Sequence, residues 1–134
     1  MLTEFELSIS GSSKYLLDAI ALLGEHGVNI ETVATASVGD KWVIKFLTGS
    51  EEEVRRTFIK ADLSFKERKV LVVDMPNRPG EWVKTAKALV DKGVALDASY
   101  LLGQNDDKLR FVFGVDKPDF AFKVAKKIPG LTVE

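Results

Sequence analysis

The sequence predicts an α+β protein built from two ferredoxin-like βαββαβ sandwiches, each an antiparallel sheet with its helices on one face. Two observations support this fold class. Strand-like and helix-like apolar spacings follow one another in the same order twice along the 134 residues. The pair Gly27-Val28 also recurs 66 residues later as Gly93-Val94, with the surrounding apolar positions in phase. We therefore expect a first domain over residues 1–67 and a second over residues 68–134.

The first domain opens with a strand in which apolar residues alternate with polar ones. Its first helix carries an apolar stripe formed by Leu16, Leu17, Ile20 and Leu23. Acidic residues in the first turn mark the start of its second helix. The expected strand, helix, two strands, helix and closing strand lie at residues 4–10, 14–26, 28–38, 41–48, from 51, and 63–65.

The second domain repeats this order of elements. Its strands alternate in the same way, and Pro118 suits the first turn of its last helix. The expected strand, helix, two strands, helix and strand lie at residues 70–75, 80–92, 94–103, 108–115, 118–127 and 131–133. Only residues 66–69 stay unassigned between the domains, a span of roughly 14 Å when fully extended.

The composition argues against several classes of function. A formal net charge of −1 and a pI of about 5.9 give no bulk attraction to nucleic acid or to a membrane, so we expect neither partner. With no cysteine and a single histidine, the sequence predicts no metal site, no cofactor and no catalytic residues. It contains no apolar run that would span a membrane and no signal peptide, so a cytoplasmic location is expected.

One turn in the second domain has the chemistry of an anion site. An apolar strand runs into residues 74–82, where Pro76 and Pro79 stiffen the chain and Gly80 begins a helix. The first N–H groups of a helix lack partners within it and attract negative charge, so a carboxylate can bind there. The alternative interpretation is an ordinary strand-to-helix turn with a proline near the first helical position.

In this context the sequence resembles the ACT domain family of small amino-acid-sensing modules. The turn Arg78-Pro79-Gly80 after a strand, followed by a helix and Gly93-Val94, carries the resemblance in the second domain. The first domain keeps Gly27-Val28-Asn29-Ile30, but Ser10-Gly11-Ser12-Ser13-Lys14 stands where the family has a Pro-Gly turn. The chain as a whole most resembles stand-alone tandem ACT proteins, which implies a regulatory protein that is not an enzyme.

The resemblance implies that paired domains bind a small molecule, expected to be an amino acid, at their interface. The turn after the first strand of one domain would face the second strand of the other, within one chain or between two chains. The expected ligand site consists of Asn77, Arg78, Pro79, Gly80 and Glu81 together with Asn29, Ile30 and Glu31. A weaker second site is expected at Gly11, Ser12 and Ser13 together with Ala95 and Leu96. The resemblance also allows an enzyme regulated in trans as a partner.

Several of these residues have alternative interpretations. Arg78 can clamp a carboxylate, or it can form a surface ion pair with Asp74 or Glu81. Glu31 and Asp97 occupy matched strand positions, where solvated charge is the default and binding of an ammonium group is the alternative. For the whole protein, the alternative is a structural or protein–protein interaction module whose ligand site has decayed.

The strand at residues 108–115 raises the question of RNA binding. It carries Phe111 and Phe113, much as an RNA-recognition motif displays aromatic residues on an inner strand. The neighbouring strand at residues 70–75 offers no aromatic residue to complete a stacking surface, so an ordinary core face is favoured.

The same neighbouring strand bears on assembly, because both of its faces are apolar. Val70 and Val72 form the outer set, and Val112 can join them. A strand buried on both faces needs a cover, which predicts that this sheet packs on another unit or chain, in a homodimer. The outer face of the first domain's sheet, with Glu4, Glu6 and Lys45, is expected to be wetter.

Overall fold

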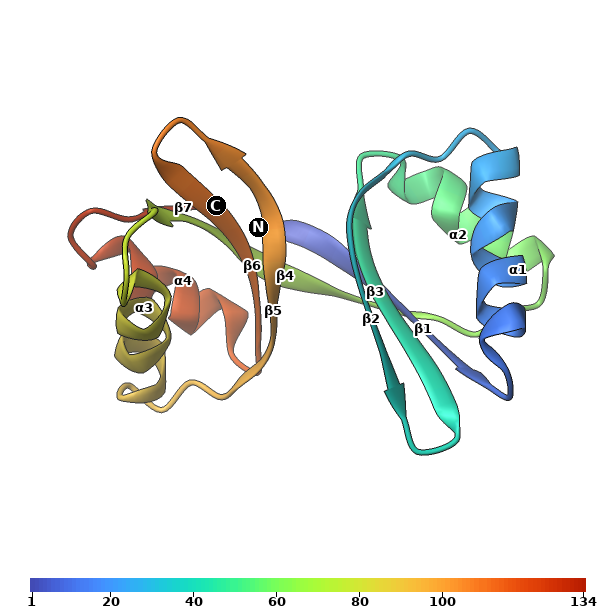
Figure 1. Ribbon diagram of the computed structural model, residues 1–134, viewed down its shortest axis with the longest axis horizontal. Coiled ribbons are helices and arrows are strands. Elements are labelled where there is room, and N and C mark those ends of the chain that lie inside the picture. The colour runs from blue at the N-terminus through green and yellow to red at the C-terminus, as the bar shows by residue number, and fades with distance from the viewer. The chain divides into compact units, whose positions relative to one another are not determined.

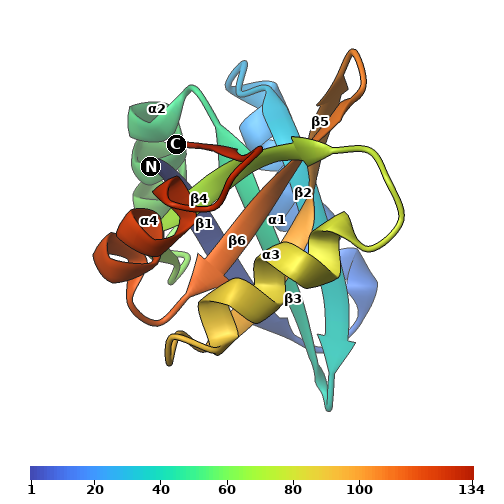
Figure 2. The ribbon, with the colours of Figure 1, turned by 90° about the vertical axis from the view of Figure 1, so that its left-hand side faces the viewer.

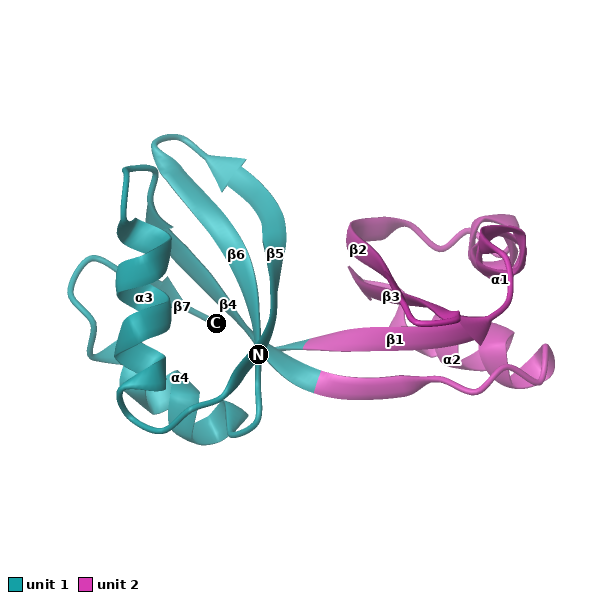
Figure 3. Ribbon diagram, turned by 60° about the horizontal axis from the view of Figure 1, so that its bottom comes forward, with its two compact units in different colours: residues 1–2, 69–134 teal, residues 3–68 magenta.

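The computed structural model describes residues 1–134, and the chain divides into two compact units (Figure 3). The N-terminal unit is Thr3–Arg68, and the C-terminal unit is Lys69–Glu134 together with Met1–Leu2. Each unit is a sheet with two helices, so the predicted α+β, ferredoxin-like fold class is confirmed. None of the four helices is long and apolar enough to cross a bilayer.

The N-terminal unit has the element order βαββαβ and the strand order β2-β3-β1-β4. Both helices lie on one side of this sheet (Figure 1). β1 and β2 each pair antiparallel with β3. The elements are β1 (Leu2–Ser10), α1 (Ser13–Glu25), β2 (Ile30–Val38), β3 (Lys41–Thr48), α2 (Glu51–Lys60) and the first residues of β4 (Lys66–Pro76).

The C-terminal unit repeats the same order, with β4 as its first strand and the strand order β5-β6-β4-β7. All three pairings in this sheet are antiparallel. Figure 2 looks onto the face that its two helices cover. After β4, the elements are α3 (Glu81–Val90), β5 (Leu96–Asn105), β6 (Lys108–Val115), α4 (Pro118–Lys126) and β7 (Thr132–Val133).

The continuous strand β4 differs from the prediction of a short strand at residues 63–65 followed by an unassigned segment. Residues 63–65 lie outside any strand, and β4 starts at Lys66 and serves as an edge of one sheet and a middle strand of the other. The run Lys66-Glu67-Arg68-Lys69 has no apolar alternation, so it resembles a linker. Two of its charged side chains instead form ion pairs: Glu67 with Arg55 at 2.7 Å, and Arg68 with Glu4 at 2.8 Å.

Each unit has its own hydrophobic core between sheet and helices. In the N-terminal unit the core centres on the fully buried rings of Phe5, Phe46 and Phe58. Helix α1 buries Leu16 and Leu23 against it. The expected contribution of Leu17 is wrong, because its side chain is 67% exposed. Successive helix positions differ by about 100°, and here the step from Leu16 to Leu17 carries the side chain past the edge of the core-facing stripe.

The outer faces of the two sheets modify the expectations about assembly. Glu4 is 1% exposed, so the prediction of a wet outer face on the first sheet is wrong at this residue. Val70, Val72 and Val112 are also fully buried, as the two-sided apolar pattern of β4 predicts. The homodimer stays a prediction.

Candidate functional site

The turn between β4 and α3 is open at the position where the sequence predicts ligand binding. Residues 77–80 are all exposed. Gly80 is the N-cap of α3 and adopts the left-handed conformation, with φ +84°. A Cβ atom built at Gly80 meets no heavy atom within 4 Å, so no side chain plugs the turn. A left-handed residue at this place favours glycine, because other residues pay a steric cost there.

The backbone of this turn leaves several hydrogen-bond donors unused. Asn77 donates its N–H to the carbonyl of Asp107 at 2.8 Å, which anchors the start of the turn. The N–H groups of Gly80, Trp82 and Val83 make no hydrogen bond within the chain. These groups lie at the N-terminus of α3, where the helix dipole favours negative charge. The turn can therefore receive a small anionic group.

Arg78 pairs with Glu81 and not with Asp74. Its guanidinium lies 2.9 Å from the Glu81 carboxylate, and the Arg78 side chain is 67% exposed against 14% for Glu81. Asp74 is held instead by Arg110, with distances of 2.8 and 3.2 Å for its two carboxylate oxygens. This hydrogen bonding raises the pKa of Arg110. A ligand carboxylate would thus compete with Glu81 for Arg78, which makes Arg78 an auxiliary contact.

The second expected half of the site lies at the start of β2 in the N-terminal unit. The Asn29 carbonyl accepts a hydrogen bond from the Thr48 hydroxyl at 2.7 Å, and that hydroxyl accepts one from the N–H of Ser50 at 3.1 Å. The backbone of Asn29 is therefore fixed by a buried threonine. Its side chain is exposed and makes no hydrogen bond within the chain, so its amide oxygen is available to a ligand ammonium group.

A β-bulge lies next to Asn29, and sequence reasoning missed it. The β2–β3 register shifts between Ile30 and Thr32, which leaves Glu31 as the extra residue. The β5–β6 register shifts between Leu96 and Ala98, which leaves Asp97 in the same role 66 residues later. Bulges re-aim side chains and are frequent next to binding sites. Matched acidic residues at that offset were the only signal in the sequence.

The turn of the expected weaker site differs from the turn at Gly80. Gly11 also has a left-handed backbone, with φ +103°, but a Cβ atom there would lie 3.1 Å from the ring of Tyr15. An aromatic side chain thus covers this turn. On the matching strand, the N–H of Ala95 donates to the Asp116 carboxylate at 2.9 Å, and Leu96 packs on the core. Ala95 offers no side-chain acceptor comparable to that of Asn29.

The residues of each expected site are divided between the two units. Residues 77–81 belong to the C-terminal unit and residues 29–31 to the N-terminal unit, and the weaker site is divided in the opposite sense. Each half is a coherent local structure. Their assembly into one ligand site stays a prediction.

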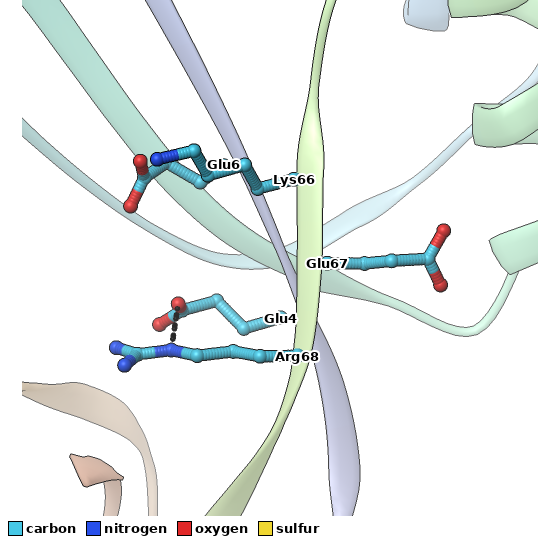
Figure 4. A pocket seen from close by; sticks show the side chains of 5 residues that line it. All are labelled: Glu4, Glu6, Lys66, Glu67 and Arg68. Atoms are coloured by element: carbon cyan, nitrogen blue, oxygen red, sulfur yellow. Dashed lines mark hydrogen bonds and ion pairs between the residues drawn. The ribbon is translucent and has the colours of Figure 1, made fainter. Parts of the chain in front are cut away.

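A charged cleft that the sequence analysis did not anticipate lies beside β1 and the start of β4 (Figure 4). It has a volume of about 250 Å³. Arg68 donates to the buried carboxylate of Glu4, and Glu67 points to the opposite side of the strand. Glu6 forms an ion pair with Lys45 at 3.2 Å. The four other charged residues that line the cleft beside Lys66 already form ion pairs within the chain, so they give no reason to place a ligand there. No group of three or more acidic or histidine side chains in the chain could hold a metal ion.

Comparison with known proteins supports the fold. No protein-family model matches the sequence, and no curated protein matches it. A solved protein from Bacteroides thetaiotaomicron is similar, with a TM-score of 0.85 and 16% identity, covering 98% of this chain and 92% of that one. The ligand-free regulatory subunit of aspartate kinase from Thermus thermophilus has a TM-score of 0.65 and 9% identity, covering 94% and 91%. That from Thermus flavus has a TM-score of 0.58 and 10% identity, covering 95% and 93%.

At these sequence identities the similarity concerns the fold. The chain has the ACT-type fold that its sequence predicts, and the solved structures that share this fold include regulatory rather than catalytic parts of aspartate kinase.

Proposed function

We propose that this protein is a non-catalytic regulatory module that binds an amino acid. The ligand lies on the turn of residues 77–81 and contacts residues 29–31 of an N-terminal unit, in the same chain or in a second copy. In this proposal the protein is a cytoplasmic homodimer that controls an enzyme in trans. The observation that carries the proposal is the open Gly80 turn with three unbonded N–H groups at the start of α3.

The two halves have complementary chemistry for a zwitterionic ligand. The N–H groups of Gly80, Trp82 and Val83 receive the ligand α-carboxylate, and the dipole of α3 adds favourable electrostatics. The side-chain oxygen of Asn29 and the carboxylate of Glu31 receive the ammonium group, since both are exposed acceptors at a bulged strand. Ile30 is half-buried and contributes apolar contact.

The mirror site is weaker in this proposal, for two reasons. Tyr15 lies against the Gly11 turn, so a ligand carboxylate would have to displace an aromatic ring. Ala95 also has no polar side chain to replace Asn29. One ligand per chain is therefore the expected stoichiometry.

A structural or protein–protein interaction module is the second candidate function. The Gly11 turn favours it, because the Tyr15 ring lies against one of the two turns. The two functions differ in their response to ligands. A ligand that binds only the folded state at about 100 times its Kd stabilises the protein by about 2.7 kcal/mol, which raises the melting temperature by several degrees.

The test is a thermal-shift screen over the common amino acids, followed by titration calorimetry of each positive ligand. The proposal expects one or a few amino acids to bind at one site per chain. Gly80→Asp should weaken that binding by at least about tenfold, because it places a negative charge beside the carboxylate site. Asn29→Ala should weaken it by several-fold through loss of an ammonium acceptor.

Two control variants separate charge from backbone strain. Gly80→Asn introduces a side chain of the same size without charge, and asparagine tolerates the left-handed region about as well as aspartate does. Gly130→Asp adds the same charge at another glycine with φ +84° and no neighbour within 4 Å of its added Cβ. Both variants should bind the amino acid more tightly than Gly80→Asp does. Undiminished binding in Gly80→Asp and Asn29→Ala would disprove the composite site, and no thermal shift with any amino acid would favour the interaction module.

A further inference from the structure

A groove between α3 and α4 of the C-terminal unit has a composition that the proposed ligand site does not explain. Its volume is about 600 Å³. The apolar part consists of Ala88, Phe120, Val124 and Ile128, and the phenyl ring of Phe120 is 44% exposed. Three lysines also line the groove, namely Lys92, Lys123 and Lys127. The groove thus combines an apolar lining with positive charge, a combination that suits an amphipathic, acidic partner.

The three lysines have no acidic partners. None of them takes part in an ion pair, and Asp91, the acid that lines the groove, is held by Lys87 at 2.7 Å. The helix segments 81–92 and 117–128 together contain seven lysines and three acids, a formal charge of +4, in a chain whose net charge is −1. This helix face is therefore a local basic region in a slightly acidic protein.

The internal repeat supplies a matched comparison. The corresponding groove of the N-terminal unit lies between α1 and α2, is about 230 Å³ in volume, and includes Lys60. The corresponding segments 15–26 and 50–61 contain three basic and five acidic residues, a formal charge of −2. The basic groove is thus not a general property of this fold and is confined to the C-terminal unit.

One sequence difference bears directly on Lys123 and on the apolar part of the groove. At an offset of 67 residues, Lys123 corresponds to Arg56 and Phe120 corresponds to Glu53. Arg56 forms an ion pair with Glu53 one turn away on α2. In α4 the acid is replaced by an exposed phenylalanine, so Lys123 loses its neutralising partner and the groove gains an aromatic side chain. This one difference therefore adds an exposed aromatic side chain to the groove and leaves Lys123 without an acidic partner.

We propose that this groove docks an acidic amphipathic helix of a partner protein. The apolar side chains of that helix lie on Phe120, Val124 and Ile128, and its acidic residues pair with Lys123 and Lys127. Lys123 of α4 and Lys127, the C-cap residue of that helix, lie four residues apart and both line the groove, so they match acids spaced by one turn on the incoming helix. A partly apolar groove between two helices suits the helix-in-groove mode of recognition. The inference does not depend on the amino-acid site.

The probe is a synthetic peptide of about four helical turns, with leucine at positions of helical spacing and glutamate elsewhere. The matched control peptide has lysine in place of glutamate. Each is titrated into the full-length ¹⁵N-labelled protein, and backbone amide shifts are followed by NMR. The expected result is saturable binding of the acidic peptide, with shifts concentrated around residues 120–128, and no binding of the basic peptide.

Charge-reversal variants localise the effect. Lys123→Glu combined with Lys127→Glu should weaken binding of the acidic peptide by about tenfold or more, since each reversal turns an attraction into a repulsion. The control is Arg56→Glu combined with Lys60→Glu, which reverses the matched positions of α2 and should leave binding unchanged. All four residues are exposed, so folding should persist, and a cooperative urea unfolding transition like that of the unaltered protein would show that each variant is folded.

Three results would overturn the inference. These are no binding of the acidic peptide, equal binding of the basic peptide, or equal loss in the α2 control. If the peptide does not bind but the protein binds vesicles of phosphatidylserine and the α4 variant loses that binding, the basic face is assigned to anionic lipid instead.

Discussion

The indole ring of Trp82 stacks on the ring of Phe113, with centroids 6.0 Å apart and an interplanar angle of 23°. The indole N–H also donates to the hydroxyl of Ser99 at 3.0 Å. Trp82 follows Gly80 by two residues, and Phe113 is a fully buried residue of β6. This contact ties the first turn of α3 to the sheet, so the unbonded N–H groups of the turn are held in fixed positions.

Replacing Trp82 should therefore affect both stability and ligand binding. Trp82→Ala is expected to cost about 2 kcal/mol, less than for a fully buried tryptophan because the side chain is 37% exposed. Trp82→Phe keeps the stacking and loses the hydrogen bond, with an expected cost of about 1 kcal/mol. Urea unfolding measures both values, and equal costs for the two variants would contradict this role of the stacking.

The hydroxyl of Thr48 should matter more than its methyl group. It donates to the carbonyl of Asn29 and accepts from the N–H of Ser50, so Thr48→Val leaves two backbone groups without their partner. The expected cost is about 1–3 kcal/mol, since Thr48 is buried. Thr35→Val, on the exposed face of β2, is the control and should be nearly neutral. Urea unfolding distinguishes the two, and a neutral Thr48→Val would contradict the proposed anchoring of Asn29.

Two buried helical threonines should respond oppositely to the same substitution. The hydroxyl of Thr57 on α2 has no hydrogen-bond partner, so Thr57→Val should be neutral or stabilise the protein by up to about 1 kcal/mol. The hydroxyl of Thr85 on α3 donates to the carbonyl of Glu81 at 3.0 Å, so Thr85→Val should cost about 1 kcal/mol. Differential scanning calorimetry provides the comparison. A destabilised Thr57→Val protein would indicate an unrecognised partner for that hydroxyl.

The ion pair of Arg110 with Asp74 should contribute to stability without a pH dependence at neutral and moderately alkaline pH. The hydrogen bond to Asp74 raises the pKa of Arg110. A raised pKa of a cation gives stability that is present below its unfolded-state pKa and lost only as pH rises through the still higher folded-state pKa. Arg110→Met should therefore lower the free energy of unfolding by about 1 kcal/mol, and by the same amount at each pH in this range. The value is small because the Arg110 side chain is partly exposed to solvent. Urea unfolding at several pH values tests this, and a cost that falls on raising the pH would contradict it.

The sequence alone predicts much of the local structure of this protein. Periodicity placed both helix–strand repeats, because a buried face repeats every two residues in a strand and about every 3.6 in a helix. The open turn at Gly80 was predictable for a related reason. The proline ring fixes its own φ angle, and glycine, which has no Cβ atom, can adopt positive φ. Neither effect requires contacts with distant parts of the chain.

Other features depended on partners far along the chain. The charged start of β4 is a strand because β1 provides its hydrogen-bond partners, and Glu4 is buried beside Arg68, 64 residues away. The bulges at Glu31 and Asp97 are shifts of register between two paired strands. The sequence of one strand alone therefore does not predict them.

What the sequence by itself determined was the set of elements, their order and the exposed glycine turn, since these follow from short-range sterics and apolar spacing. What only the tertiary structure decided was which neighbours each side chain meets: the ring of Tyr15 over Gly11, the pairing of Arg78 with Glu81, and the unpaired lysines of the α3–α4 groove. Pairing and covering are properties of residues brought together by folding, and short-range periodicity does not encode them.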